Sequence, residues 1–171
     1  MSDSIAALVR QARAGSDAAA ATLFDQLWPD VLRTARAIVG NGGAAEDVAQ
    51  EAMVKAFGRL DGFDGRGPFG AWVRRIVVNT ALNALRGRGR AVPLTDAVAV
   101  PEAPDPSGGG ALAAAVRDLP ADRRVLVGLR FGLDLTPTEI AEVMDLPVGT
   151  VKSRLSRVLE QLRETLEGVP R

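Results

Sequence analysis

The chain contains no cysteine and no histidine among its 171 residues. Zinc fingers, most metallohydrolases and enzymes with a Ser-His or Cys-His nucleophile are therefore excluded, because each needs one of these side chains. No run of eighteen apolar residues is present, and Met1 to Ser4 forms neither a basic segment nor an apolar signal core. We expect a cytoplasmic protein that is not an enzyme, with no metal, no cofactor and no membrane insertion.

Aromatic residues are also scarce, at 4% of the chain, whereas 47% of the residues are hydrophobic. The hydrophobic residues are rich in alanine, leucine and valine, which favours helices over sheets. The net charge is zero, but arginine is the only charged residue between Gly65 and Arg90, and acids predominate between Ala91 and Asp118. Because local charge decides where phosphate binds, this pattern predicts two nucleic-acid contacts joined by an acidic connector.

Proline and glycine indicate how the chain is divided. Residues 88–110 are rich in proline, end in Ser107 to Gly110 and carry a net negative charge, which predicts a flexible linker. Helical periodicity on both sides predicts an all-α fold of two small domains, residues 1–87 and 111–171. We expect helices near residues 4–14, 17–39, 44–60 and 68–87, and others that begin near residues 111, 120, 136 and 147.

The segment from Thr136 to Leu155 predicts a short helix, a tight turn and a second helix. Thr136 and Glu139 can form a capping box, and Pro137 suits the first helical position. The turn follows at Asp145. Helical spacing then places one apolar face on the second helix, formed by Val148, Val151, Leu155, Val158, Leu159, Leu162 and Leu166.

The opposite face of this second helix carries hydroxyl groups and cations. Its outward residues are Thr150, Ser153, Ser156 and Arg157, with Lys152 and Arg154 on the flanks. No carboxylate occurs between Leu146 and Leu159. This pattern favours a helix that binds the DNA major groove. An ordinary amphipathic helix with a solvated face remains an alternative for this segment alone.

The helix expected near residues 68–87 gives a second indication of DNA binding. Arg75, Asn79 and Arg86 fall on one stripe, together with Leu82, beside the apolar face. Two cations and an amide in this order can follow a phosphate backbone, and the amide can bond a base edge. A solvated arginine face is the alternative interpretation.

The helix expected near residues 44–60 carries Asp47, Gln50 and Glu51. The acids are near the start of the helix, where they complement its dipole, and this structural role alone can account for them. The functional alternative is a surface for a basic protein partner. A paired-carboxylate enzyme site is the weakest option, because no partner base or pocket is indicated nearby.

Four segments together resemble the extracytoplasmic-function group of the bacterial sigma-70 family. They are Ala45 to Ala52, Phe69 to Asn79, Leu119 to Arg124 and Pro147 to Arg154. Their order and spacing make the resemblance specific, and it covers nearly all of the chain outside the linker. It implies an RNA polymerase sigma factor that directs core polymerase to promoters and initiates transcription.

The resemblance also implies a role for each domain. Residues 1–87 would be region 2, which binds core polymerase and melts the −10 element, with Asp47, Gln50 and Glu51 against the coiled coil of the β′ subunit. The loop from Asp61 to Pro68 would hold a flipped base, and Phe63 could stack on it beside Arg75, Asn79 and Arg86. Residues 111–171 would be region 4, in which Thr150, Lys152, Ser153, Arg154, Ser156 and Arg157 would recognise the −35 element. The partners would be core polymerase with its β and β′ subunits, promoter DNA and an anti-sigma factor.

The sequence leaves two other functions as alternatives. A stand-alone helix-turn-helix regulator would bind DNA without polymerase, but the acidic Asp47 surface and the linker argue against it. A sigma mimic would bind an anti-sigma factor without DNA, yet Arg75, Asn79, Lys152 and Arg157 all remain. Ser156 stands where some relatives have an aromatic residue, which leaves the −35 base preference open.

Overall fold

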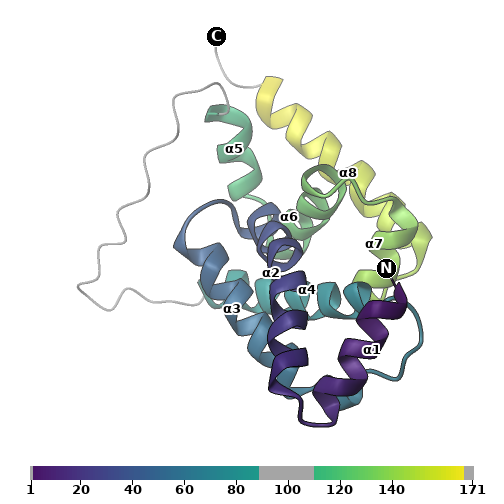
Figure 1. Cartoon of the computed structure of the whole chain (residues 1–171). Helices are drawn as coiled ribbons and strands as arrows, with labels where there is room; N and C mark the ends of the chain where they lie inside the picture. Colours follow the sequence, from purple (N-terminus) through teal and green to yellow (C-terminus); the bar gives the residue numbers. More distant parts are fainter. Residues whose placement is uncertain (1, 89–109, 168–171) are drawn as a thin grey trace.

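The computed structural model describes residues 2–88 and 110–167, and the described residues confirm the expected all-α class (Figure 1). The expected linker at residues 88–110 lies outside the described residues, apart from its two ends. The elements are α1 (Ser2–Arg13), α2 (Asp17–Val39), α3 (Gly43–Gly58), η1 (Leu60–Gly62), α4 (Phe69–Arg88), α5 (Gly110–Arg117), α6 (Ala121–Val127), η2 (Gly128–Gly132), α7 (Pro137–Met144) and α8 (Val148–Glu167). We call α1–α4 the N-terminal bundle and α5–α8 the C-terminal bundle.

The N-terminal bundle is built around the long helix α2. Ser16 caps this helix by accepting a hydrogen bond from the Ala19 amide at 3.3 Å, and α2 ends before Gly40, whose φ of 91° suits glycine. Pro29 lies inside α2 and does not end it. The helices α1, α3 and α4 all pack against α2.

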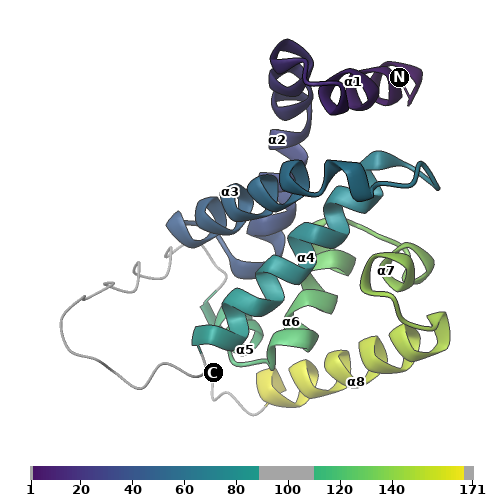
Figure 2. The ribbon, with the colours of Figure 1, turned by 90° about the horizontal axis from the view of Figure 1, so that it is seen from below.

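Helix α4 lies between the rest of the N-terminal bundle and the C-terminal bundle. Figure 2 shows it with α1–α3 on one side and α6–α8 on the other. One face of α4 is the predicted apolar face, where Phe69, Val73, Val77 and Thr80 are buried and Trp72 and Ile76 are half-buried. A second face, formed by Val78, Ala81 and Leu85, is also buried, at 1%, 0% and 8% exposure. The sequence pattern did not predict this second face.

The C-terminal bundle has a small core of its own between α5 and α8, formed by Ala115, Leu119, Val158 and Leu162. The predicted inward positions on α8 are partly wrong, because Leu159 and Leu166 are 43% and 36% exposed. Within the part of the chain that the structure describes, the helices packed on α8 leave the side with these two leucines partly exposed. The short π-helical segment η2, which follows α6, places Phe131 at the surface, where the Arg130 guanidinium lies 5.7 Å from the centre of the Phe131 ring.

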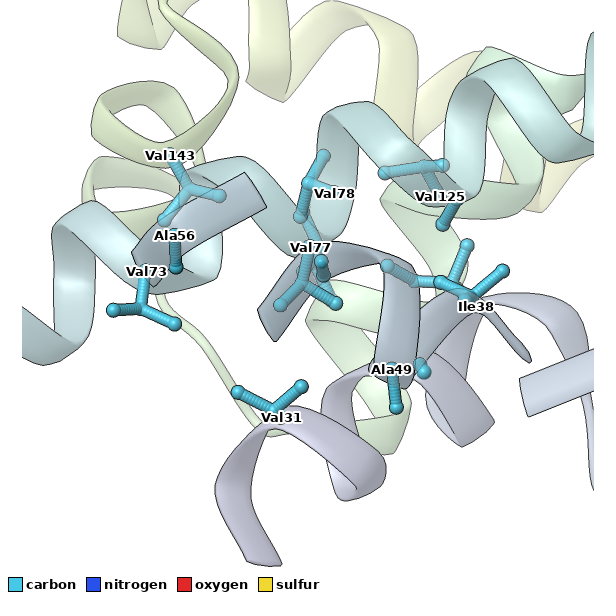
Figure 3. Packing of buried hydrophobic residues seen from close by; sticks show 14 of the residues in the cluster. Val31, Ile38, Ala49, Ala56, Val73, Val77, Val78, Val125 and Val143 are labelled. Atoms are coloured by element: carbon cyan, nitrogen blue, oxygen red, sulfur yellow. The ribbon is translucent and has the colours of Figure 1, made fainter. Parts of the chain in front are cut away.

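The two bundles share a single larger core. One continuous cluster of buried side chains contains Val31, Ile38 and Val77 from the N-terminal bundle and Val125, Leu129 and Val143 from the C-terminal bundle. Figure 3 shows Val125 of α6 close to Ile38 of α2, with Val78 of α4 beside them. The bundles are therefore packed together in addition to being joined by the chain.

Candidate nucleic-acid and polymerase interfaces

The turn between α7 and α8 is fixed by local hydrogen bonds. The predicted capping box is present: Thr136 Oγ1 accepts a bond from the Glu139 amide at 3.3 Å, and Glu139 Oε2 accepts one from the Thr136 amide at 2.8 Å. The Thr136 hydroxyl also donates to Glu139 Oε2, at 2.7 Å. The bonds from the Thr136 amide and hydroxyl to this carboxylate lower the pKa of Glu139 below its usual value of 4.5, with a smaller contribution from the charge of Arg74. Asp145 ends α7 in the left-handed conformation, at φ 55° and ψ 51°. The Pro147 carbonyl then accepts bonds from the Thr150 and Val151 amides, which starts α8.

The exposed face of α8 carries the residues expected to contact the −35 element. Lys152, Ser153, Ser156 and Arg157 are exposed, and Thr150 and Arg154 are half-buried. Ser153 Oγ donates to the Thr150 carbonyl at 3.0 Å, which leaves its lone pairs available to a partner. Within residues 2–88 and 110–167, no carboxylate lies within 4.0 Å of the three cations, so their charge is not neutralised. A phosphate group that binds this face would not have to displace a protein carboxylate from the cations.

The stripe expected on α4 is also present, with Arg75, Asn79 and Arg86 exposed. Arg75 differs from the other two because its guanidinium donates a hydrogen bond to the main-chain carbonyl of Glu142 on α7, at 2.5 Å. The cation of this stripe that lies beside the 61–68 loop is therefore bonded to the C-terminal bundle.

The 61–68 loop is exposed except at Phe63. Gly65 and Gly67 have φ values of 77° and 85°, which non-glycine residues rarely adopt. A cavity of about 440 Å³ adjoins the loop and is lined by loop residues, by Trp72 and Arg75 of α4, and by Glu142 and Val143 of α7. The cavity is the size of a ligand site, but one of its walls belongs to the C-terminal bundle.

Phe63 does not project into this cavity as a free ring. It is 9% exposed and packs edge-on against Phe69, with ring centres 5.0 Å apart, and against Trp72 at 5.7 Å. Its role in this conformation is to anchor the loop to the start of α4. Base stacking by Phe63 stays a prediction, and it would require the ring to leave this aromatic cluster.

The outer face of α3 presents Asp47, Gln50 and Glu51, all exposed as expected. Glu51 forms an ion pair with Lys55 at 2.5 Å. Val54 lies one turn further along the same face and is 74% exposed. We call these four residues, Asp47, Gln50, Glu51 and Val54, the α3 stripe. A partner protein that covered this stripe would bury the apolar Val54 side chain together with its polar neighbours.

Comparison with known proteins identifies the family. A family model described as Sigma-70 region 2 matches residues 23–91, and one described as Sigma-70, region 4 matches residues 109–162. The chain is 39% identical over 139 residues to the ECF RNA polymerase sigma-E factor of Escherichia coli strain K12, covering 70% of this chain and 72% of that protein. The chain belongs to the extracytoplasmic-function group of the sigma-70 family. It is a sigma factor, a transcription initiation factor that binds core RNA polymerase and promoter DNA.

Other relatives agree with this assignment. The RNA polymerase sigma-H factor of Pseudomonas aeruginosa strain PAO1 is 39% identical over 142 residues, covering 72% of this chain and 73% of that protein. The sigma factor RpoE from Bartonella quintana, solved with the anti-sigma factor NepR, is 26% identical with a TM-score of 0.62, and the match covers 86% of this chain and 96% of that one. CnrH, solved with the cytosolic domain of CnrY, has the same fold, with a TM-score of 0.65 at 22% identity over 98% of this chain and 99% of that one.

Two functional candidates in this sigma factor were missed from the sequence. Val54 could have been found, because it continues the i, i+3, i+4, i+7 spacing of the α3 stripe. Arg13 could not, because its role depends on tertiary structure: it lies on α1 and bonds the main chain at Leu60 and Phe63, about fifty positions away.

The described residues contain no group of three or more acidic, histidine or cysteine side chains placed to hold a metal ion. None of the helices that the structure describes is long and apolar enough to cross a membrane.

Proposed function

We propose that this sigma factor divides its work among three surfaces: the α3 stripe binds the β′ coiled coil of core polymerase, α4 and the 61–68 loop open the −10 element, and α8 recognises the −35 element. The observation that supports this division most directly is the exposed, unpaired basic face of α8. The acids of the α3 stripe, by contrast, suit a basic protein partner and would repel DNA.

Neither DNA-binding surface is extensive. Three cations on the front half of α8 and two on the α4 stripe offer few phosphate contacts, so each bundle alone should bind DNA weakly at physiological salt. Core polymerase, through its β and β′ subunits, would hold both bundles on one promoter and make the two contacts additive through effective concentration. The protein would work in the cytoplasm, where polymerase and DNA are found.

An anti-sigma factor is part of the proposal. It is supported by the likeness to the sigma factor RpoE of Bartonella quintana, which was solved with the anti-sigma factor NepR. The exposed apolar side chains Val54 and Leu159 offer contact area to such a partner, although core polymerase could use the same residues.

Reconstituted transcription tests the proposed function. Core polymerase with the purified protein should start at discrete sites on a genomic template, whereas core alone should not. Asp47→Lys should abolish these starts by weakening core binding, and Glu164→Lys, an equal charge change on the exposed far end of α8, should preserve them. Absence of specific starts would reject the function. DNA binding of equal strength with and without core would favour a stand-alone regulator.

A further inference from the structure

Helix α4 is exposed along one narrow stripe. Between residues 71 and 87, the exposed positions are Arg75, Asn79, Asn83, Arg86 and Gly87. The four side chains among them follow at spacings of four, four and three residues, so at 100° per residue they lie within an arc of about 80°. The exposed part of α4 therefore consists of two neighbouring amides with an arginine at each end.

Asn83 takes the place that the sequence pattern gave to Leu82. In the structure Leu82 is half-buried and packs against the shared core of the two bundles, whereas Asn83 is exposed. No acidic residue occurs between residues 65 and 90. The stripe is therefore polar from Arg75 to Arg86, with no apolar interruption and no negative charge.

Both amides are free to bind a partner. Within the residues that the structure describes, neither the Asn79 side chain nor the Asn83 side chain forms a hydrogen bond with the protein. An asparagine amide offers two N–H donors and a carbonyl oxygen with two lone pairs. Each of the two side chains therefore keeps its full capacity for hydrogen bonds.

The stability of α4 gives no reason for these two asparagines. Asparagine is a poorer helix former than alanine, lysine, arginine or glutamate, because its amide competes for hydrogen bonds of the backbone. It is favoured at helix caps, but Asn79 and Asn83 both lie inside α4, which continues to Arg88. A partner outside the chain would account for two unbonded amides at exposed helical positions.

The spacing of the amides fits the spacing of bases in DNA. At 1.5 Å per residue, Asn79 and Asn83 are about 6 Å apart along the helix axis. Bases follow one another at 3.4 Å along a strand, so two base steps, about 6.8 Å, are the nearest match. An asparagine amide can bond a donor and an acceptor on one base edge, and the flanking arginines can bond phosphates.

We propose that Asn83 is a second base-reading side chain of the −10 surface, and that it contacts a base about two steps along the promoter from the base that Asn79 contacts. This inference rests on the proposed function, in which α4 binds the −10 element. It adds that two identical side chains on one helix set the specificity at two separate positions.

Transcription from promoter libraries tests this inference. The starts that wild-type holoenzyme makes on a genomic template define a promoter, and each position of its −10 element is then randomised. Asn83→Ala should lower the preference for the best base about tenfold at one position and leave the other positions unchanged. Asn79→Ala should do the same at a different position. Asn41→Ala, which removes an exposed asparagine from the loop before α3, is the matched control and should change no position.

Thermal unfolding separates base reading from a structural role of the amide. Because alanine is the better helix former, Asn83→Ala should melt at the same temperature as wild type or at a higher one. Relaxed specificity without loss of stability is the expected combination. A lower melting temperature with unchanged base preferences would assign Asn83 a structural role and overturn the inference.

Three results in the promoter libraries would also overturn it. The first is unchanged preference at every position of the −10 element in Asn83→Ala. The second is an equal loss for all sequences, which is typical of a phosphate contact. The third is relaxation at the same position as in Asn79→Ala. A failure of the proposed function would appear separately, as wild-type holoenzyme that shows no base preference at any position of this element.

Discussion

The Arg13 guanidinium on α1 donates two hydrogen bonds to the carbonyl oxygen of Leu60, at 2.9 Å from Nε and 2.6 Å from Nη2. It also donates to the Phe63 carbonyl and lies 3.9 Å from the Asp61 carboxylate. One side chain thus holds both ends of the turn that leads into the 61–68 loop. Arg13 lies outside the segment that the region 2 model matches, yet it positions a loop within that segment.

We expect Arg13→Gln to impair promoter opening without weakening core binding. Loss of these charge-assisted bonds should lower the free energy of unfolding by about 1–3 kcal/mol and loosen the loop. Permanganate reactivity of unpaired −10 thymines should fall in the variant holoenzyme. Arg10→Gln, at an exposed position on the same helix, is the control. Normal reactivity in Arg13→Gln would show that the loop does not depend on this side chain.

The capping box predicts a pH dependence of stability. The folded-state pKa of Glu139 is lowered, so its ionised form stabilises the fold above the usual value of 4.5, and this stabilisation is lost as pH falls through the folded pKa. Glu139→Gln keeps an oxygen acceptor but removes the charge. Urea unfolding should therefore show the variant to be less stable than wild type at pH 7, with the difference shrinking below pH 4.5. A difference independent of pH would contradict this assignment.

Val54→Ser should weaken core binding and leave folding unchanged. The Val54 side chain is 74% exposed in the free protein, and burying it against polymerase would contribute up to about 2 kcal/mol. A competition assay for core polymerase measures the loss. Leu166→Ser, an exposed apolar residue at the far end of α8, should have no such effect. If both variants compete for core polymerase equally well, Val54 does not contact core polymerase.

Arg157→Ala should weaken binding of the holoenzyme to its −35 element by about 1–3 kcal/mol if the side chain contacts a base. Specificity at one base position should relax at the same time. If Arg157 contacts phosphate, the loss should be similar for all sequences, and the salt dependence should become shallower by about one unit. Arg163→Ala, whose side chain lies 3.7 Å from Glu160 on the back half of α8, is the control. Unchanged affinity on both counts would exclude Arg157 from DNA contact.

Features that depend on local geometry could be predicted from the sequence. The prediction of a capping box at Thr136 and Glu139 is confirmed, because the three-residue spacing fixes both bonds once a helix begins there. The buried positions Val151, Leu155, Val158 and Leu162 followed from helical periodicity. The exposed positions Asp47, Gln50 and Glu51 follow in the same way from the apolar face of α3.

Features that depend on which helix packs where could not be predicted. Leu159 was expected to be buried, but the apolar stripe of α8 is wider than the surface that α5–α7 cover. Val78 was not singled out, because it is buried only through the packing of the C-terminal bundle on α4. Phe63 was treated as a loop residue, since its aromatic partners Phe69 and Trp72 become visible only in three dimensions. Gly128 and Gly132 gave no signal, because nothing in their own segment requires glycine.

Gly128 and Gly132 of η2 pack against Ala37 of α2, and a Cβ atom on Gly132 would lie 2.7 Å from the Ala37 Cβ. Both sides of this contact belong to one polypeptide. Because no second molecule takes part in this contact, the packing of the two bundles does not depend on the concentration of the protein.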